Sequence, residues 1–187
     1  MAKHLEIMKL REKEVGRLTE DLSNKSEGFE DPKLIMIGGY ALRAFVPFSR
    51  YTRDCDFVLK KLNGWNLDKI KGLLPKDLDI EAFERRDNYG FLRCIKILKV
   101  NKRSAKVSLD FMEGEVRGRT EEQTFFITDE FLQRVRKVKI PIADKEIEIY
   151  VPDYADYLIL KFVSARSSDI RDIATLVWKN GVPEDLK

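Results

Sequence analysis

The stretch IGGYALRAFVPFSRYTRDCDF, residues 37–57, decides how this chain of 187 residues is interpreted. Two adjacent glycines, Gly38 and Gly39, follow an apolar run, and Asp54 and Asp56 stand at alternate positions before the next apolar run. Glycines between a strand and a helix often form only a turn. Their missing side chains would equally let a chain of phosphates approach the backbone where a helix begins. The rest of the sequence has to decide between these interpretations.

The two aspartates are predicted to share one face of a strand. Alternate residues of a strand point the same way, so Asp54 and Asp56 face one side, and Cys55 and Phe57 face the other. Two carboxylates on one side of a buried strand repel each other unless a cation lies between them. Oxygen ligands of this kind suit Mg²⁺. A solvated strand face is the alternative, and the apolar opposite face argues against it.

A third carboxylate, Asp110, lies in the strand-like segment AKVSLDFM, residues 105–112. It shares a face with Lys106 and Ser108. If this strand lies beside the strand of Asp54 and Asp56, three carboxylates would converge and could hold two metal ions about 3.5–4 Å apart. One ion would activate an attacking hydroxyl, and the other would neutralise charge on a triphosphate. The alternative is that Asp110 is a solvated residue at a strand end.

The composition narrows the chemistry and the compartment. His4 is the only histidine, which excludes Ser-His, Cys-His and HExxH machinery inside the fold. Cys55 and Cys94 form no CxxC pattern and are predicted to be buried, reduced thiols. A net charge of +3 neither favours nor excludes a nucleic-acid partner. No apolar run approaches ~20 residues and the N-terminus is highly charged, so we expect no membrane segment, no signal peptide and a cytoplasmic protein.

The spacing of apolar residues predicts an α+β fold, in which a strand-rich centre lies between helices at both ends. Residues 1–30 are interpreted as an N-terminal helix, at 3–22, and a loop, and residues 31–187 as the main domain with a C-terminal helical pair. Strands are predicted at 34–37, 55–60, 78–84, 91–100, 105–112, 137–142 and 146–151. Further helices are predicted at 40–46, 66–74, 129–135, 152–165 and 168–181. The helix at 152–165 is expected to bury the stripe Ala155, Leu158, Ile159, Phe162 and Val163.

Taken together, these pieces carry a family resemblance over residues 34–176. GGYALRAFVPFSRYTRDCDF, residues 38–57, resembles the signature of the nucleotidyltransferase superfamily that includes DNA polymerase beta: Gly-Gly or Gly-Ser, a spacer, Asp-x-Asp and a later strand Asp. GGxAL followed by RxTxDxDF, residues 50–57, is more narrowly similar to the AbiEii/MenT-type nucleotidyltransferases of toxin–antitoxin and phage-defence systems. The ending VPDYADYLILKFVSARSSDIRDIATL, residues 151–176, also resembles that family: a Pro, a helix with a central Lys, then Arg-x-x-Asp-x-x-Asp.

The resemblance implies a twisted mixed β-sheet flanked by helices, the nucleotidyltransferase fold, and an enzyme of the EC 2.7.7 type. It implies metal ligation by Asp54, Asp56 and Asp110, with two Mg²⁺ or Mn²⁺ ions as cofactors and an NTP as substrate. The expected reaction transfers an NMP to a hydroxyl of RNA, such as a tRNA 3′ end, or to a Tyr or Ser hydroxyl of a protein. A cognate antitoxin or toxin is the further partner that the resemblance implies.

The same resemblance assigns the remaining site residues. It implies phosphate contacts from the backbone of Gly38 and Gly39, although the second glycine stands where the superfamily commonly has serine. Arg50 and Thr52 are further implied phosphate contacts. Two residues near the C-terminus complete the set: Lys161 in a nucleotide-phosphate or catalytic role, and Asp172 as its supporting acid.

Other interpretations of these residues stay open. Lys161 could belong to a solvated helix face, and Arg166, Asp169, Arg171 and Asp172 could form a surface salt-bridge ladder. Tyr89 or Phe91 could stack on a base beside a basic rim that grips RNA phosphates, or the basic residues could be merely exposed hairpin tips. That rim would consist of Arg85, Arg86, Arg93, Lys99, Lys102, Arg103 and Lys106. A non-catalytic nucleotide-binding or protein-interaction module of the same fold, such as an antitoxin-like half of a pair, is the alternative function.

Overall fold

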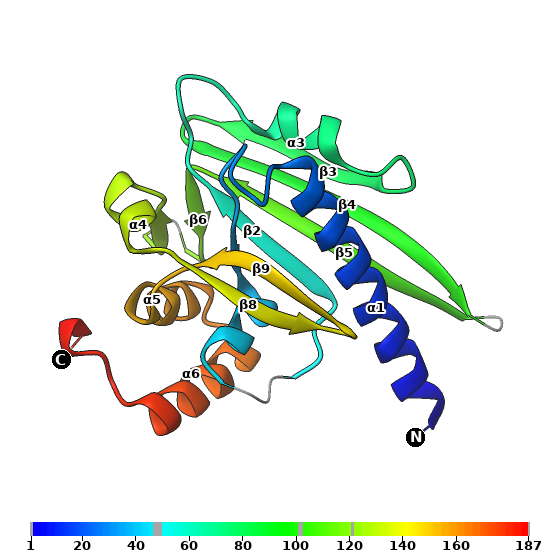
Figure 1. The fold of residues 1–187 in the computed structure, drawn as a ribbon. Coiled ribbons are helices and arrows are strands. Elements are labelled where there is room, and N and C mark those ends of the chain that lie inside the picture. The colour runs from blue at the N-terminus through cyan, green and yellow to red at the C-terminus, as the bar shows by residue number, and fades with distance from the viewer. Residues whose placement is uncertain (1, 47–49, 101–102, 121, 187) are drawn as a thin grey trace.

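The computed structural model of the chain describes residues 2–46, 50–100, 103–120 and 122–186 (Figure 1). Its strands are β1 Ile35–Ile37, β2 Asp54–Leu59, β3 Asp79–Arg86, β4 Tyr89–Val100, β5 Arg103–Glu113, β6 Glu115–Arg117, β7 Thr124–Phe126, β8 Arg136–Ile142 and β9 Lys145–Val151. Its α-helices are α1 Ala2–Lys25, α2 Gly38–Ala41, α3 Leu67–Leu73, α4 Asp129–Arg134, α5 Tyr154–Ser164 and α6 Ser167–Asn180. Two 3₁₀ helices, η1 Leu42–Ala44 and η2 Glu184–Leu186, complete the described elements.

Seven of these strands form one mixed sheet with the order β3-β4-β5-β2-β1-β9-β8. The β2–β5 and β1–β9 pairs are parallel, and the other pairs in this sheet are antiparallel. A separate two-stranded sheet joins β6 to β7. Helices flank the large sheet, so the predicted α+β fold with a mixed sheet is confirmed.

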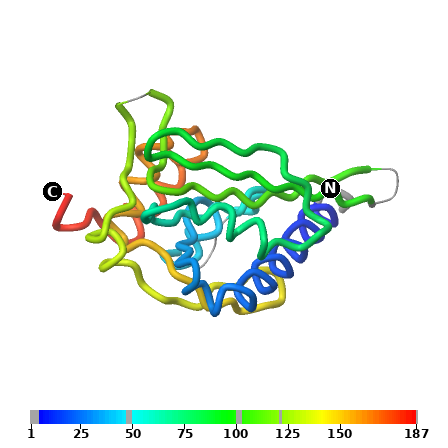
Figure 2. Tube along the Cα trace, turned by 90° about the horizontal axis from the view of Figure 1, so that it is seen from above, coloured from blue at the N-terminus to red at the C-terminus, as the bar shows by residue number. Residues whose placement is uncertain are grey.

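The hairpin of β4 and β5 extends beyond the rest of the large sheet. The two strands pair continuously from Gly90, opposite Glu113, to Val100, opposite Arg103. The end of β4 and the start of β5 lie on the side of the molecule opposite the C-terminal helix η2 (Figures 1 and 2). Part of the predicted turn at 101–104 lies outside the described residues, and so does Lys102 of the predicted basic rim.

The larger core lies between the sheet, α1 and α3. Phe57 of β2 stacks between Phe29 and Phe111, with ring centroids 6.1 and 5.3 Å apart. Cys55 and Cys94 are free and buried in this core, as the sequence predicts. Because side chains alternate along a strand, the acidic residues of β2 face the opposite side of the sheet.

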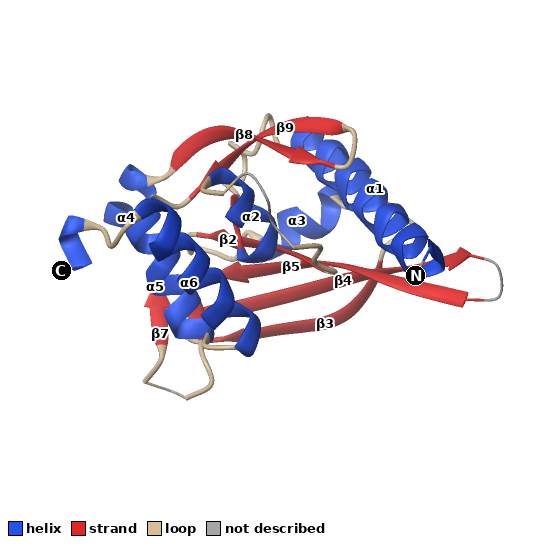
Figure 3. Ribbon diagram, turned by 90° about the horizontal axis from the view of Figure 1, so that it is seen from below, coloured by secondary structure: helices blue, strands red, loops and turns tan. Residues whose placement is uncertain are grey.

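Helix α1 belongs to this same core. It ends at Lys25, three residues beyond the predicted end, and Val15, Leu18 and Leu22 are completely buried among residues of the sheet. Figure 3 shows α1 lying along one side of the strands. Helix α1 therefore shares one core with the sheet, because its apolar stripe has its partner there.

A smaller apolar cluster lies on the opposite face of the sheet. It joins residues of β1 and β2 to β6, α4 and α5 through Ile35, Ile37, Val58, Val116, Ile127, Phe131 and Leu160. The sequence patterns did not predict β6, which is only three residues long and pairs with β7. This cluster holds β6 and α5 beside the acidic residues of β2.

The prediction of which residues of α5 are buried is wrong. Phe162 is 57% exposed, and Leu158 is the one member of the predicted stripe that is fully buried. The buried side of α5 instead carries Asp156, Tyr157, Leu158, Leu160 and Lys161. Counting apolar residues selected the wrong face because this helix packs its polar side chains inward, against other charged groups. None of the helices in the described part of the chain is long and apolar enough to cross a bilayer.

We predict that Leu18→Ala will lower the free energy of unfolding by about 2–5 kcal/mol, because it empties space in the core that α1 shares with the sheet. Leu5→Ala is the matched control, since Leu5 is 44% exposed on the same helix. Urea unfolding of both variants measures the difference. A cost for Leu18→Ala no larger than that for Leu5→Ala would contradict the shared core.

Candidate active site

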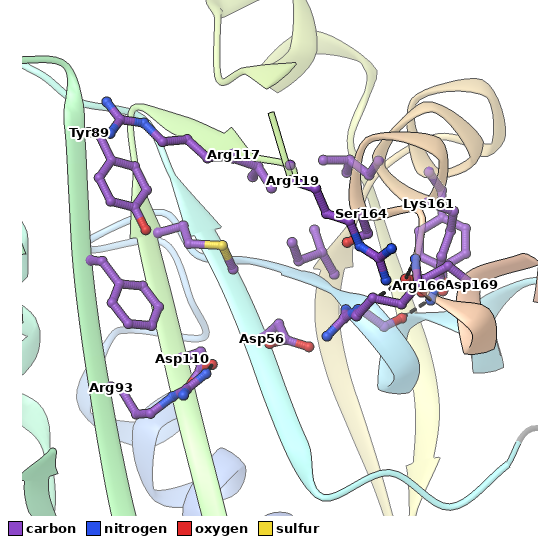
Figure 4. Close-up of a pocket in the computed structure, with 18 residues that line it drawn as sticks. Asp56, Tyr89, Arg93, Asp110, Arg117, Arg119, Lys161, Ser164, Arg166 and Asp169 are labelled. Atoms are coloured by element: carbon purple, nitrogen blue, oxygen red, sulfur yellow. Dashed lines mark hydrogen bonds and ion pairs between the residues drawn. The ribbon is translucent and has the colours of Figure 1, made fainter. Parts of the chain in front are cut away.

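A cavity of about 490 Å³ opens on the face of the sheet that carries the acidic residues. Its lining includes Gly38, Asp56, Asp110 and Lys161 of the predicted site. Figure 4 shows Asp56 on the floor of the cavity, with Asp110 on one side and Lys161 on the other. Strands from the middle of the sheet and helix α5 thus bring residues far apart in the sequence to one place.

Gly38 is held in a conformation that favours glycine. Its φ is +67°, and a Cβ at this position would lie 2.1 Å from Oδ2 of Asp56. Its carbonyl oxygen accepts a hydrogen bond of 2.6 Å from the hydroxyl of Tyr157. The close approach of the backbone to Asp56 is therefore the structural reason for a glycine here.

Gly39 and Thr52 pack against each other, and neither is among the described residues that line the cavity. A Cβ on Gly39 would lie 3.0 Å from Cβ of Thr52, whose hydroxyl donates to the carbonyl of Asp54 at 3.3 Å. The helix that follows is the single turn α2, continued by η1. The predicted helix start is thus too short to offer phosphate the dipole of a full helix.

The three predicted carboxylates lie on neighbouring strands and face the same way. Asp56 of β2 stands opposite Asp110 of β5 in parallel register, and Asp54 stands opposite Ser108. Partners in adjacent strands lie about 4.8 Å apart. Asp110 therefore lies beside Asp56, and its 4% exposure excludes the alternative of a solvated residue at a strand end.

Each carboxylate has a different electrostatic environment. Burial, followed by the charges of Asp110 and Asp54, raises the pKa of Asp56 to about 7. Arg93 donates to both oxygens of Asp110, from Nε to Oδ1 at 2.9 Å and from its terminal nitrogen to Oδ2. The hydroxyl of Ser108 donates to Asp54 at 2.7 Å. Arg93 thus forms hydrogen bonds with Asp110, and Ser108 forms one with Asp54. Asp56 lies between these two carboxylates and is repelled by the charges of both.

The donor chemistry of these acids fits a hard divalent cation. Burial and the charges of Asp110 and Asp54 raise the pKa of Asp56, and a cation would relieve this repulsion. Carboxylate oxygens are the ligands that Mg²⁺ and Mn²⁺ prefer. Across the described residues, however, no three His, Cys, Asp or Glu side chains are arranged to hold a metal ion. Arg93 occupies both oxygens of Asp110, so a metal would need this ion pair to open.

On the other side of the cavity, Lys161 joins a buried ionic network. Its side chain is 3% exposed, and its ammonium donates to Asp169 at 2.9 Å and to Asp172 at 2.8 Å. Arg50 forms two hydrogen bonds of 3.2 Å to Asp172, and Arg166 donates to Asp169 at 3.0 Å. An ammonium has three N–H donors, so one remains for a ligand in the cavity.

Two predicted site residues belong to this network. Asp172 accepts hydrogen bonds from Lys161 and from Arg50, and Arg50 is not among the described residues that line the cavity. The roles of Lys161, Asp172 and Arg50 toward a nucleotide stay predictions. The alternative prediction of a salt-bridge ladder on the surface of α6 is wrong for its two acidic residues. Asp169 and Asp172 are only 0% and 4% exposed, so they are buried. Three cations and two carboxylates leave the network with a net positive charge.

The predicted basic rim is divided by the structure. Arg93 lines the cavity together with Tyr89 and Phe91. Arg85, Arg86, Lys99, Arg103 and Lys106 are not among the described residues that line it. Arg85 and Lys106 form ion pairs with Asp68 and Glu81. The hairpin residues are remote because β4 and β5 carry them away from α5, toward the far tip of the sheet (Figure 1).

The cavity also contains residues that the sequence patterns did not single out as site residues. Arg117, Arg119, Ser164, Arg166 and Asp169 all line it. A usable signal existed on α6, where Asp169 and Asp172 lie on one face with the partly buried Ile173 and the buried Leu176, at i, i+3, i+4 and i+7. Arg117 and Arg119 have no such signal, because their placement depends on the short β6–β7 sheet.

Comparison with known proteins identifies the class. A family model described as "Nucleotidyltransferase of unknown function (DUF6036)" matches residues 13–180. The chain therefore belongs to this nucleotidyltransferase family. The match begins inside α1 and runs through α6, so it includes every residue of the cavity. No curated protein matches the chain.

Two solved structures from Helicobacter pylori are similar to the chain. JHP933 is 16% identical, and the similarity covers 88% of this chain and 65% of that protein with a TM-score of 0.52. A protein provisionally described as a nucleotidyltransferase is 14% identical, with 88% and 67% coverage and a TM-score of 0.49. The chain thus spans about two thirds of the length of each. At such identity, the similarity to JHP933 concerns the fold alone.

We predict that Gly38→Ala will lower the free energy of unfolding by about 1–3 kcal/mol. The new methyl group would meet the carboxylate of Asp56, and alanine disfavours a φ of +67°. Gly64→Ala is the control, because a Cβ there would meet no atom within 4 Å, and it should change stability by less than about 0.5 kcal/mol. Equal stability of the two variants in chemical denaturation would contradict the close approach.

We predict that Lys161→Met will cost roughly 3 kcal/mol of stability, because it leaves two buried carboxylates without their shared cation. Burial opposes ionisation of Asp169, but hydrogen bonds and charge from Lys161 and Arg166 hold its pKa below the ordinary value. This contribution is present above about pH 4 and is lost as the pH falls, so the gap between variant and wild type should narrow in acid. Lys179→Met, on the exposed end of α6, should change little. Urea unfolding across pH measures both, and a pH-independent gap would contradict this account.

Proposed function

We propose that this chain transfers a nucleoside monophosphate from an NTP to an acceptor hydroxyl and releases pyrophosphate, in a reaction that depends on Mg²⁺ or Mn²⁺. One observation carries the proposal: Asp56, Asp110 and Lys161 line a single cavity in a chain that belongs to a nucleotidyltransferase family. Paired carboxylates beside a cationic network are what phosphoryl transfer needs, because the reaction is catalysed chiefly by positioning and electrostatic stabilisation.

In this proposal the two sides of the cavity have different roles. Asp54, Asp56 and Asp110 would hold the metal ions, which when bound would neutralise the triphosphate and activate the acceptor hydroxyl. Lys161 has one remaining N–H donor and belongs to a network with a net positive charge. The network would therefore attract the β- and γ-phosphates. The space that the missing side chain of Gly38 leaves is filled by the carboxylate of Asp56, so Gly38 would help to fix Asp56 at the site.

The reaction would follow from these positions. The acceptor oxygen forms a bond to the α-phosphorus, and the bond from the α-phosphorus to the bridging oxygen breaks. Pyrophosphate leaves with that electron pair toward the cationic network, and the hydroxyl proton passes to Asp110. Arg93 donates one hydrogen bond to each oxygen of Asp110, which leaves further lone pairs on the carboxylate. Opening of the Arg93–Asp110 pair would free the carboxylate further for the metal ions and the proton.

The acceptor and the biological setting extend this proposal further. The motif of residues 38–57 resembles AbiEii/MenT-type enzymes, and on that ground we propose a role in a toxin–antitoxin system. The acceptor would be a hydroxyl of RNA, such as a tRNA 3′ end, or of a protein. A cognate antitoxin or toxin would be the protein partner.

A second candidate function rests on the Arg93–Asp110 ion pair. Because Arg93 satisfies both oxygens of Asp110, it could stand permanently in place of a cation. The chain would then be a non-catalytic nucleotide-binding or protein-interaction module of the same fold. Such a module would bind an NTP in the cavity without transferring any part of it.

We predict that the wild-type protein, given α-³²P-labelled NTP, Mg²⁺ or Mn²⁺, total tRNA and cell lysate, will label a macromolecular acceptor. The Asp54→Asn/Asp56→Asn variant should lose at least about 100-fold of this activity, because the ligands for the charge-neutralising ions are removed. Asp144→Asn/Asp185→Asn, at two exposed positions, is the charge-matched control.

The outcomes separate the two candidates. Nucleotide binding without transfer would favour the non-catalytic module. Full activity in the double variant would overturn the assignment of Asp54 and Asp56. A wild-type protein that neither binds nor transfers a nucleotide would remove the basis of either function.

A further inference from the structure

The wall of the cavity opposite Lys161 is built from alternating aromatic rings and arginines. The rings of Tyr89 and Phe91 are nearly parallel, with an interplanar angle of 6° and centroids 6.4 Å apart. The guanidinium of Arg117 lies over the Tyr89 ring at 4.2 Å, and that of Arg93 lies 5.4 Å from the centre of the Phe91 ring. All four line the cavity. We call these four residues the aromatic wall. Arg119 also lines the cavity, and its side chain extends toward Arg166 (Figure 4).

The aromatic wall is held in place by its surroundings. Tyr89 and Phe91 are alternate residues of β4 and so point to the same side of the sheet. Arg117 is oriented by Glu115, which accepts a hydrogen bond of 2.7 Å from its Nε. Its side chain is nevertheless 41% exposed, and that of Arg119 is exposed at the rim of the cavity. In the part of the chain that the structure describes, Arg119 forms no ion pair, so its charge is available to a ligand.

The geometry of the reaction assigns this wall to the acceptor. In phosphoryl transfer the attacking and leaving oxygens lie roughly in line with the phosphorus. Pyrophosphate would leave toward the network of Lys161 and Arg166, so the acceptor must approach from the opposite side of Asp56. Figure 4 shows Tyr89, Arg93 and Asp110 on that side. This step rests on the proposed function, because it uses the direction of the leaving group.

We propose that the acceptor is the end of a single-stranded polynucleotide, whose terminal bases stack on Tyr89 and Phe91 and whose phosphates bind Arg117 and Arg119. Flat aromatic rings bind bases of any sequence, and arginines bind phosphates. The acceptor hydroxyl would then lie beside Asp110, where it forms its bond to the α-phosphorus as pyrophosphate leaves. The polynucleotide is therefore the second substrate, which binds beside the NTP.

This chemistry favours a polynucleotide over a protein acceptor. A Ser or Tyr hydroxyl on a protein would bring few negative charges to Arg117 and Arg119. A nucleic-acid strand brings one phosphate per nucleotide, and its bases match the two parallel rings. Charge and shape thus both favour a single-stranded nucleic acid. The test distinguishes RNA from DNA.

The test measures binding in the absence of NTP, by fluorescence anisotropy of a labelled single-stranded RNA of about 12 nucleotides. Tyr89→Leu/Phe91→Leu keeps apolar volume in the wall but removes its flat rings. Its dissociation constant for this RNA should rise roughly 5- to 150-fold for each base that loses its stacking ring. Trp178→Leu is the matched control, because Trp178 is an 86% exposed aromatic on α6, away from the cavity. That control should bind like the wild type.

A second variant, in which two arginines lose their charge, tests the proposal even if Tyr89→Leu/Phe91→Leu folds poorly. Arg117→Gln/Arg119→Gln should weaken RNA binding and reduce the slope of log K against log salt concentration by about 0.7 for each phosphate that the arginines no longer neutralise. Arg171→Gln, at an exposed position of α6, is its control. An unchanged salt slope in the double variant would overturn the assignment of these arginines.

Three outcomes would overturn the proposal. One is equal RNA affinity of the wild type and the aromatic variant. A second is equally tight binding of an abasic oligonucleotide of the same length, because it carries the phosphates without the bases. The third is label transfer to protein alone in the wild type. Tight binding of single-stranded RNA, or of DNA of the same sequence, that depends on the rings would support it.

Failure of this proposal is distinguishable from failure of the proposed function. If RNA binds at the aromatic wall but no NMP is transferred, the assignment of the wall stands and the catalytic function fails. If the protein binds and cleaves an NTP but does not bind RNA, the catalytic function stands and the wall is wrongly assigned. A fluorescent NTP analogue, titrated into wild type and Tyr89→Leu/Phe91→Leu, reports the NTP site separately.

Discussion

The parallel register of β2 and β5 is the constraint on which the rest of the site depends. It sets Asp56 directly opposite Asp110, at the spacing of adjacent strands, with Asp54 two residues away on the same face. Like charges so close are costly when they are partly removed from water. The raised pKa of Asp56, about 7, is a direct consequence of burial and of its two acidic neighbours. A one-residue slip of either strand would turn its carboxylate into the apolar core.

The surrounding elements offset this repulsion from several directions. Arg93, from the neighbouring strand β4, binds both oxygens of Asp110, and Ser108 donates to Asp54. The charges of Arg166 and Lys161 act against the upward shift in the pKa of Asp56. Lys161 also donates hydrogen bonds to two buried acids of α6, Asp169 and Asp172. The cavity is therefore a set of coupled charges, in which moving one cation changes the state of its neighbours.

The two walls of the cavity offer different chemistry to a ligand. The wall with Lys161 and Arg166 is a dense ionic network, suited to a compact and highly charged group. The wall with Tyr89 and Phe91 combines ring faces with arginines, suited to a larger ligand that is both flat and anionic. Asp56 lies between them, so a ligand on one wall meets a ligand on the other only at the acidic centre (Figure 4). Membership of a nucleotidyltransferase family is consistent with this division.

The sequence by itself determined the α+β class, most element positions and the shared face of Asp54 and Asp56, because strand alternation and helix periodicity are local. It also singled out Gly38, Asp110, Lys161 and Asp172, which carry local motifs. Only the tertiary structure decided which partners these residues have. The Arg93–Asp110 pair, the burial of Asp169 and the positions of Arg117 and Arg119 depend on strand register and on how α5 and α6 pack. Apolar counting even selected the wrong face of α5, because a charged side chain can be buried when its partners come from another element. Those partners are set by long-range packing, which no local pattern encodes.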